Sequence, residues 1–113
     1  MSDKNTFAEY VVHDVLGQID GITARAMFGG HGIYKHGIIF AIIAYDELYF
    51  KVDESNRTDF EQLGSHPFVY AQGGHKSTTM SYWLVPQEIL EDKERLAEWV
   101  ERSVAISAAK KKQ

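Results

Sequence analysis

The sequence predicts an α+β fold: a two-layer sandwich in which helices cover one face of an antiparallel sheet of five to six strands. Apolar residues recur at helical spacing near both ends of the chain, whereas the middle alternates with the two-residue period of strands. Short turns join the predicted strands, and such turns connect antiparallel neighbours. With 113 residues, the chain has the length of a single domain, 1–113.

The first element is expected to be a helix that begins near Asn5 or Thr6. Thr6 and Glu9 have the spacing of a capping box, in which the two side chains satisfy backbone N–H groups at the helix start. The apolar residues that follow form one helical stripe: Phe7, Val11, Val15 and Leu16. Gly17 and Gly21 end this helix, because Gly accepts the left-handed geometry of a helix terminus.

A meander of four strands is predicted next. The strands are expected over residues 22–28, 31–35, 38–44 and 48–52. His36 and Gly37 form a tight hairpin turn, since Gly accepts a positive φ there. The short polar stretch around Asp46 supplies the next turn.

The second half of the chain is expected to alternate helices with a hairpin. Asp53 opens a helix that Gly64 closes, because Asp is a good N-cap residue. Strands follow over residues 68–71 and 78–85, with glycines in their connection. Pro86 begins a short helix and Asp92 caps the last one. Residues 107–113 are expected to fray into a basic tail.

The second face of the sheet carries more apolar and aromatic residues than a face in water needs. Two interpretations stay open: loops and the first helix cover it, or it contacts another subunit or protein. Tyr and Trp are enriched at protein interfaces, so the second interpretation makes Tyr34, Tyr49, Lys51 and Trp83 the interaction residues. Under this second interpretation we expect the chain to form a homodimer, because homodimers are the commonest oligomers.

Composition and charge exclude several classes of function. The chain has no cysteine, which excludes disulfides, iron–sulfur clusters and thiol nucleophiles. Its net charge is −4, so strong direct DNA binding is not expected, although Lys110–Lys112 could contribute to it. The N-terminus lacks the apolar segment of a signal peptide, and the longest apolar run has seven residues, Ile38–Ala44. The chain is therefore expected to be cytoplasmic.

Neither catalytic nor metal-binding chemistry is evident in the sequence. His31 and His36 lie five residues apart with no metal-ligand motif around them, and no serine occurs in a nucleophile-elbow context. We therefore expect no catalytic residue, no metal and no cofactor. The alternative to an interaction module is an anion- or metabolite-binding domain, in which backbone N–H groups of Gly29–Gly32 form a nest helped by Lys35 or Lys51.

Several segments resemble the TfoX (Sxy) N-terminal-domain family over roughly residues 7–108. The segment Met27-Phe28-Gly29-Gly30 is similar to the family's Met-Phe-Gly-Gly signature. Further similar blocks are Leu48-Tyr49-Phe50-Lys51-Val52-Asp53 with Asn56-Arg57, Pro67-Phe68 with Tyr70, Met80-Ser81-Tyr82-Trp83 with Pro86, Glu88 and Leu90, and finally Leu96 with Trp99. Each block is short, but their order and spacing together are fairly specific.

The resemblance implies a fold similar to the secretion-chaperone-like α+β domains and a non-enzymatic role. The family's best-known members regulate competence for DNA transformation together with the cyclic-AMP receptor protein, so it implies a protein partner in transcription regulation. It also implies core positions for Met27 and Phe28, a turn or bulge at Gly29 and Gly30, and a surface contact at Lys51. Those regulators carry a second, C-terminal domain for which this sequence leaves no room, so a stand-alone relative is expected.

Overall fold

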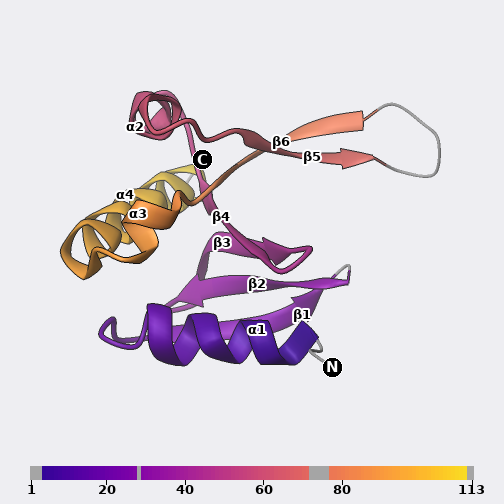
Figure 1. Cartoon of the computed structure of the whole chain (residues 1–113), viewed down its shortest axis with the longest axis vertical. Coiled ribbons are helices and arrows are strands. Elements are labelled where there is room, and N and C mark those ends of the chain that lie inside the picture. Colours follow the sequence, from indigo (N-terminus) through magenta and orange to yellow (C-terminus); the bar gives the residue numbers. More distant parts are fainter. Residues whose placement is uncertain (1–3, 28, 72–76, 112–113) are drawn as a thin grey trace.

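The structure, a computed structural model, describes residues 4–27, 29–71 and 77–111 (Figure 1). The helices are α1 (Lys4–Tyr10), which continues as the π-helical segment η1 (Val11–Val15), α2 (Arg57–Gln62), α3 (Gln87–Leu90) and α4 (Lys93–Lys111). The strands are β1 (Ile22–Met27), β2 (Gly30–Lys35), β3 (Ile38–Ala44), β4 (Glu47–Lys51), β5 (Pro67–Ala71) and β6 (Ser77–Leu84). The predicted α+β class is confirmed.

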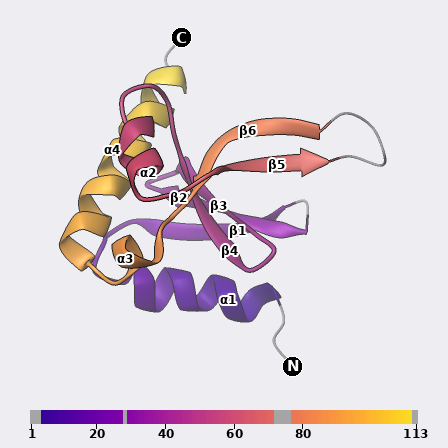
Figure 2. The same cartoon turned by 45° about the horizontal axis from the view of Figure 1, so that its top comes forward.

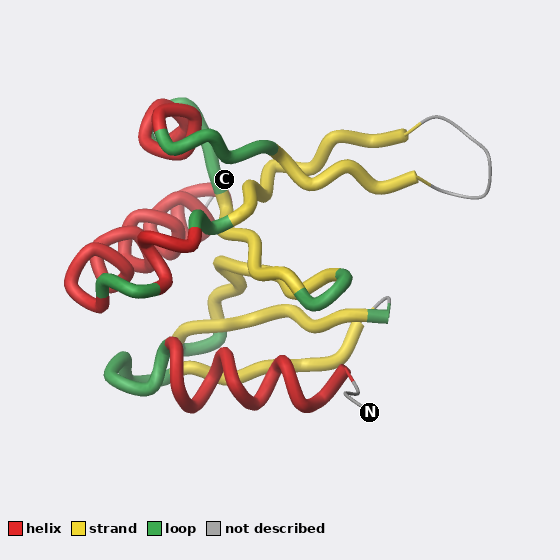
Figure 3. The backbone as a smooth tube through the Cα atoms, in the orientation of Figure 1, coloured by secondary structure: helices red, strands yellow, loops and turns green. Residues whose placement is uncertain are grey.

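All strands form one antiparallel sheet in the order β1-β2-β3-β4-β6-β5. The first four strands are the predicted meander. The β5–β6 hairpin joins it through a short ladder in which Tyr49, Phe50 and Lys51 of β4 pair with β6. Because this ladder is short, the remainder of the hairpin projects beyond the meander (Figures 1 and 3).

The helices share one hydrophobic core with one face of the sheet, which we call the helix side. This core combines buried residues of α1, η1, α2, α3 and α4 with residues of β2, β3 and β4. Figure 2 shows the helices gathered around one part of the sheet, away from the outer ends of strands β5 and β6. Phe40 and Phe50 lie at the centre of this core, with ring centroids 5.7 Å apart.

A register shift in the β2–β3 ladder explains an irregularity in this core. Ile33 pairs with Ala41 but Tyr34 pairs with Ile39, so Phe40 is an extra residue in β3. A bulge of this kind interrupts the alternation of side chains between the two faces. Phe40 and Ala41 are consecutive, yet both are fully buried in the helix-side core.

Two helix starts differ from the prediction. Helix α1 begins at Lys4, so Thr6 lies inside the helix. Helix α2 begins at Arg57, four residues after Asp53. The Asp53 carboxylate instead accepts hydrogen bonds from the Ser55 backbone N–H (2.7 Å) and hydroxyl (2.6 Å), which forms a turn before the helix.

The predicted cap of α4 is confirmed, because the Asp92 carboxylate accepts a hydrogen bond from the backbone N–H of Arg95 at 3.2 Å. The helix runs to Lys111, through most of the segment where fraying was expected. Two contacts anchor it close to that segment. The buried Ser103 hydroxyl donates to the Lys51 carbonyl at 2.8 Å, and Ile106 is buried.

Two hairpin turns have positive φ at both central residues. His36 (φ 50°) and Gly37 (φ 83°) form the predicted turn between β2 and β3. Tyr45 (φ 54°) and Asp46 (φ 60°) form the second, between β3 and β4, without a glycine. Left-handed backbone is costly for a bulky residue, so Tyr45 occupies a strained position.

Candidate functional site

The sheet face opposite the helices carries its own apolar cluster, and we call this face the open face. Its most buried members are Tyr49, Phe68 and Tyr82, which come from β4, β5 and β6. The rings of Tyr49 and Phe68 lie 5.1 Å apart between centroids. This cluster contains no helical residue, so strands pack it without a covering helix.

A second group of open-face side chains gathers over Gly32, where β2 passes between β1 and β3. A Cβ atom built on Gly32 would lie 3.1 Å from Cδ1 of Ile39, 3.2 Å from the sulfur of Met27 and 3.3 Å from Cε1 of Tyr34. These three side chains are half-buried. Met27 therefore belongs to the open face and not to the helix-covered core, which corrects the role that the family resemblance implied.

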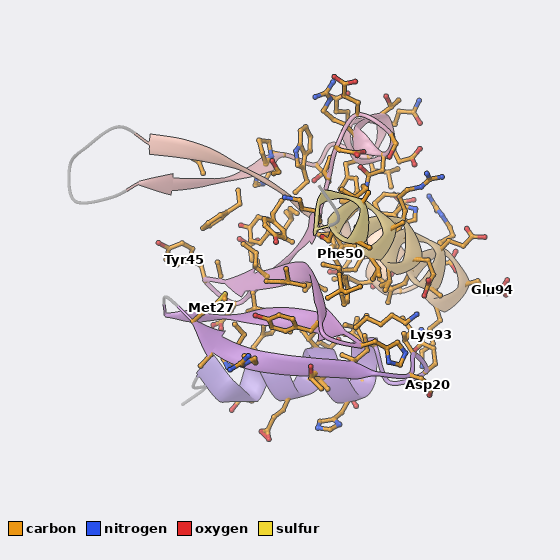
Figure 4. The ribbon with its side chains drawn as sticks, turned by 180° about the vertical axis from the view of Figure 1, so that it is seen from behind. Asp20, Met27, Tyr45, Phe50, Lys93 and Glu94 are labelled. Atoms are coloured by element: carbon orange, nitrogen blue, oxygen red, sulfur yellow. The ribbon has the colours of Figure 1, made fainter. Side chains whose placement is uncertain are left out.

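Tyr45 is the most exposed of the large hydrophobic residues described in the structure, with 83% of its surface accessible. It stands at the tip of the β3–β4 hairpin (Figure 4). Its ring centroid lies 6.4 Å from that of Phe68, so Tyr45 extends the open-face cluster into solvent. The open-face patch is defined here by its half-buried and exposed apolar residues: Met27, Tyr34, Ile39, Ile42, Ala44 and Tyr45.

Two buried tyrosines of the open face, Tyr49 and Tyr82, have pKa values raised above the ordinary value of 10.0. Burial raises the pKa of Tyr49 to about 12, and the nearby Glu47 carboxylate, which accepts a hydrogen bond from the Tyr49 hydroxyl at 3.3 Å, adds to this shift. Burial also raises the pKa of Tyr82, with a smaller contribution from Tyr34. The face therefore presents neutral hydroxyl groups beside apolar surface.

Lys51 lies on the open face, as expected for a surface contact. Its Nζ atom stands 5.1 Å from the centroid of the Tyr82 ring, which is cation–π geometry. Arg25 also belongs to this face, since it pairs with Gly32 across the β1–β2 ladder and is exposed. Lys51 thus borders the aromatic cluster, whereas Arg25 lies at the β1 end of the open face.

Trp83 does not belong to this surface, and its assignment as an interaction residue is wrong. It pairs with Phe50 in the β4–β6 ladder, and directly paired residues share a face. Its ring lies 6.4 Å from Phe60, whose ring lies 4.5 Å from Trp99 of α4. Trp83 therefore packs beneath the helices.

The structure also bears on the two interpretations of the second face. Helix α1 packs on the helix side, so it does not cover the open face. Neighbouring strands bury Tyr49 to 4% and Tyr82 to 9% exposure, with Phe68 of β5 against Tyr49. Tyr34 and the rest of the open-face patch stay partly exposed.

The glycines of the Met-Phe-Gly-Gly signature have different roles, and Phe28 lies outside the described residues. Gly29 has φ 79° and forms the turn between β1 and β2. Gly30 has no positive φ, contrary to the expectation for a turn residue. A Cβ on Gly30 would lie 2.0 Å from the carbonyl oxygen of Ile43, so this glycine permits β2 and β3 to approach closely.

The alternative anion nest does not form at Gly29–Gly32. Residues 30–32 belong to β2, which pairs with β1 on one side and β3 on the other. Their backbone groups therefore take part in the pairing of the sheet. Lys35 forms an ion pair with Glu101 of α4 at 2.5 Å, and Lys51 lies over Tyr82. Neither cation faces an anion site with these glycines.

The described part of the chain shows neither a metal site nor a membrane-spanning helix. Within residues 4–27, 29–71 and 77–111, no group of three or more His, Asp or Glu side chains is arranged to hold a metal ion. None of the helices described has the length and apolar character needed to cross a membrane.

Most of the sequence matches a known protein family. A family model described as the TfoX N-terminal domain matches residues 14–107. The matched range includes all six strands and most of α4, so it covers the sheet on which both faces are built. No curated protein matches the sequence.

Proposed function

The chain belongs to the family of TfoX N-terminal domains, and from this premise we propose that it is a non-enzymatic protein-interaction module of the cytoplasm. The observation that carries the proposal is the open-face patch, with the strained and exposed Tyr45 at its margin. A two-layer fold needs one covered sheet face, and the helices already cover the other one.

The composition of the patch favours a polypeptide partner. Tyr34 and Tyr45 supply large aromatic surface with a polar tip, and Met27 supplies an adaptable apolar side chain. Arg25 stands on the same face as a charged neighbour. Aromatic residues, Met and Arg are the types enriched at protein interfaces, so a protein contact suits this face better than a small ligand.

The first partner that we propose is a second copy of the chain, joined through the two open faces. A symmetric dimer requires one self-complementary patch, and homodimers are the commonest assemblies. The resemblance to regulators of competence for DNA transformation supports a further proposal, a contact with a protein of the transcription machinery. Both partners would use the open-face patch.

Light scattering at micromolar concentration tests the homodimer with the chain and two matched variants. We expect the wild type to have about twice the monomer mass of 12.8 kDa. Tyr45→Asn should shift it towards the monomer, because Asn removes the exposed ring while tolerating a positive φ. Tyr10→Ser removes another exposed tyrosine, on α1, and should leave the mass unchanged.

A wild type that scatters as a 12.8 kDa monomer would exclude the homodimer. The broader proposal is then tested by affinity capture from a bacterial lysate with wild type and Tyr45→Asn side by side. A protein held by the wild type and lost by the variant supports the open face as a docking surface. If the variant captures the same proteins as the wild type, the open face is not the contact.

A further inference from the structure

Two charges of opposite sign flank the open-face patch. Arg25 on β1 is exposed and pairs across the ladder with Gly32 of the open face. Glu47 is the exposed first residue of β4, and its carboxylate accepts a hydrogen bond from the hydroxyl of Tyr49 on the same face. The patch is therefore bordered by a cation on the β1 side and by an anion at the start of β4.

These two charges are not neutralised by ion pairs within the described part of the chain. Neither Arg25 nor Glu47 forms an ion pair with any residue that the structure describes. Strands β2 and β3 lie between them, which separates their strands by three spacings, or about 14 Å. Lys51, at the other end of β4, differs from them because its Nζ atom already lies over the Tyr82 ring. Arg25 and Glu47 are thus available to charges outside the chain.

The positions of the two charges suit a symmetric pair of chains. When two identical faces pack against each other, a two-fold axis runs parallel to the faces and between them. An axis midway between Arg25 and Glu47 crosses the open face near β2 and β3, where Gly32 pairs with Ile42. It brings Arg25 of each copy opposite Glu47 of the other copy. The apolar patch then lies at the centre, with one ion pair on each side.

We propose that two copies of the chain recognise each other through reciprocal ion pairs between Arg25 and Glu47, an inference that rests on the proposed function, in which the open faces form a homodimer. An apolar centre with a charged rim is the usual anatomy of a protein interface. Opposite charges also fix the register of the two faces, because other registers bring like charges together. A second copy is the occupant that supplies both complementary charges at the required spacing.

Light scattering of charge-reversed variants at micromolar concentration tests the proposal. Arg25→Glu leaves two acidic side chains in each reciprocal contact, and Glu47→Lys leaves two basic ones. Each variant alone should raise the dissociation constant of the dimer by about tenfold, because repulsion replaces attraction at both contacts. An equimolar mixture of the two variants should recover the dimer, since both contacts then join opposite charges.

Matched reversals on helix α4 separate this contact from a general change in net charge. Arg102→Glu and Glu98→Lys reverse exposed residues of α4, which packs on the helix side of the sheet. Each should keep the wild-type mass. Recovery of the dimer in the mixture also shows that both open-face variants are folded, because an unfolded chain presents no sheet face.

The wild type and the variants distinguish this inference from the proposed function. A wild type with the monomer mass of 12.8 kDa would refute the proposed homodimer, and the reciprocal contact with it. A wild-type dimer that persists in both Arg25→Glu and Glu47→Lys would leave the homodimer standing and overturn the reciprocal contact. Loss of the dimer in both variants without recovery in their mixture would also overturn it, because the two residues would then not face each other.

Discussion

Gly30 is the position where a single methyl group should disturb the sheet most, and Gly30→Ala tests this directly. A Cβ on Gly30 would stand 2.0 Å from the carbonyl oxygen of Ile43, whereas real Cβ atoms essentially never approach within 3.0 Å. The obstructing atom belongs to the backbone of Ile43 and not to a flexible side chain, so it cannot simply rotate away. Strands β2 and β3 must therefore separate by about 1 Å at this end of their ladder.

The expected cost follows from that separation. An N–H···O bond near 2.9 Å is lost when it lengthens by about 1 Å, with a net cost of about 1 kcal/mol for each bond. Displacement of well-packed surroundings adds about 1–3 kcal/mol. We expect the free energy of unfolding to fall by about 2–4 kcal/mol, which lowers Tm by about 8–17 °C for a chain of this size.

Urea and thermal unfolding, followed by circular dichroism, measure the loss of stability in Gly30→Ala. A variant of a second glycine, Gly37→Ala, is the control. Gly37 has φ 83° and an added Cβ there would meet nothing within 4 Å, so Gly37→Ala carries only the left-handed backbone cost of about 1–2 kcal/mol. Asn tolerates that backbone region, so Gly37→Asn should recover part of this loss. Gly30→Asn should recover nothing, because its constraint is steric.

A Gly30→Ala variant that unfolds like the wild type would refute the close-approach argument. Recovery by Gly30→Asn would instead show that Gly30 needs a positive φ, as its place in the signature turn first suggested. Either outcome would mean that β2 and β3 are not held together at this point in the way the structure shows.

Three further predictions concern strain, alkaline pH and a buried histidine. Tyr45→Asn relieves left-handed strain while losing little buried surface, so thermal unfolding should show a gain of about 0.5–1 kcal/mol; a clear loss would contradict the strain. The pKa of Tyr49 is about 12 in the folded chain and 10.0 without burial, so the folded state resists ionisation and its stability falls as pH rises from 10.0 to about 12. Urea titrations across that range should show a shallower fall for Tyr49→Phe, and parallel curves would count against the shift. His31 is buried on the helix-side face of β2, and its Nδ1 has no hydrogen-bond partner within the described part of the chain. His31→Leu should therefore raise the free energy of unfolding by about 1 kcal/mol, and a destabilised variant in chemical denaturation would refute this.

Elements that depend on local geometry could be predicted from the order of the residues alone. The two-residue period predicted the meander, Gly37 marked a turn that needs a positive φ, and Asp92 marked the start of α4. The predicted family is confirmed as well, because a family pattern is itself a property of sequence. These signals depend on a few neighbouring residues, so they can be recognised without knowledge of the folded structure.

Which side chains lie together on one face of the sheet depends on contacts between strands that are distant in the chain. Alternation along one strand separates its two faces, but the register between β4 and β6 decided that Trp83 joins Phe50 beneath the helices while Tyr82 lies on the open face. The approach of Ile43 to Gly30 depends likewise on two strands that only the folded sheet brings together. The alternation of side chains along one strand does not predict which residues of the neighbouring strand pair with it. The packing of the whole sheet fixes that register.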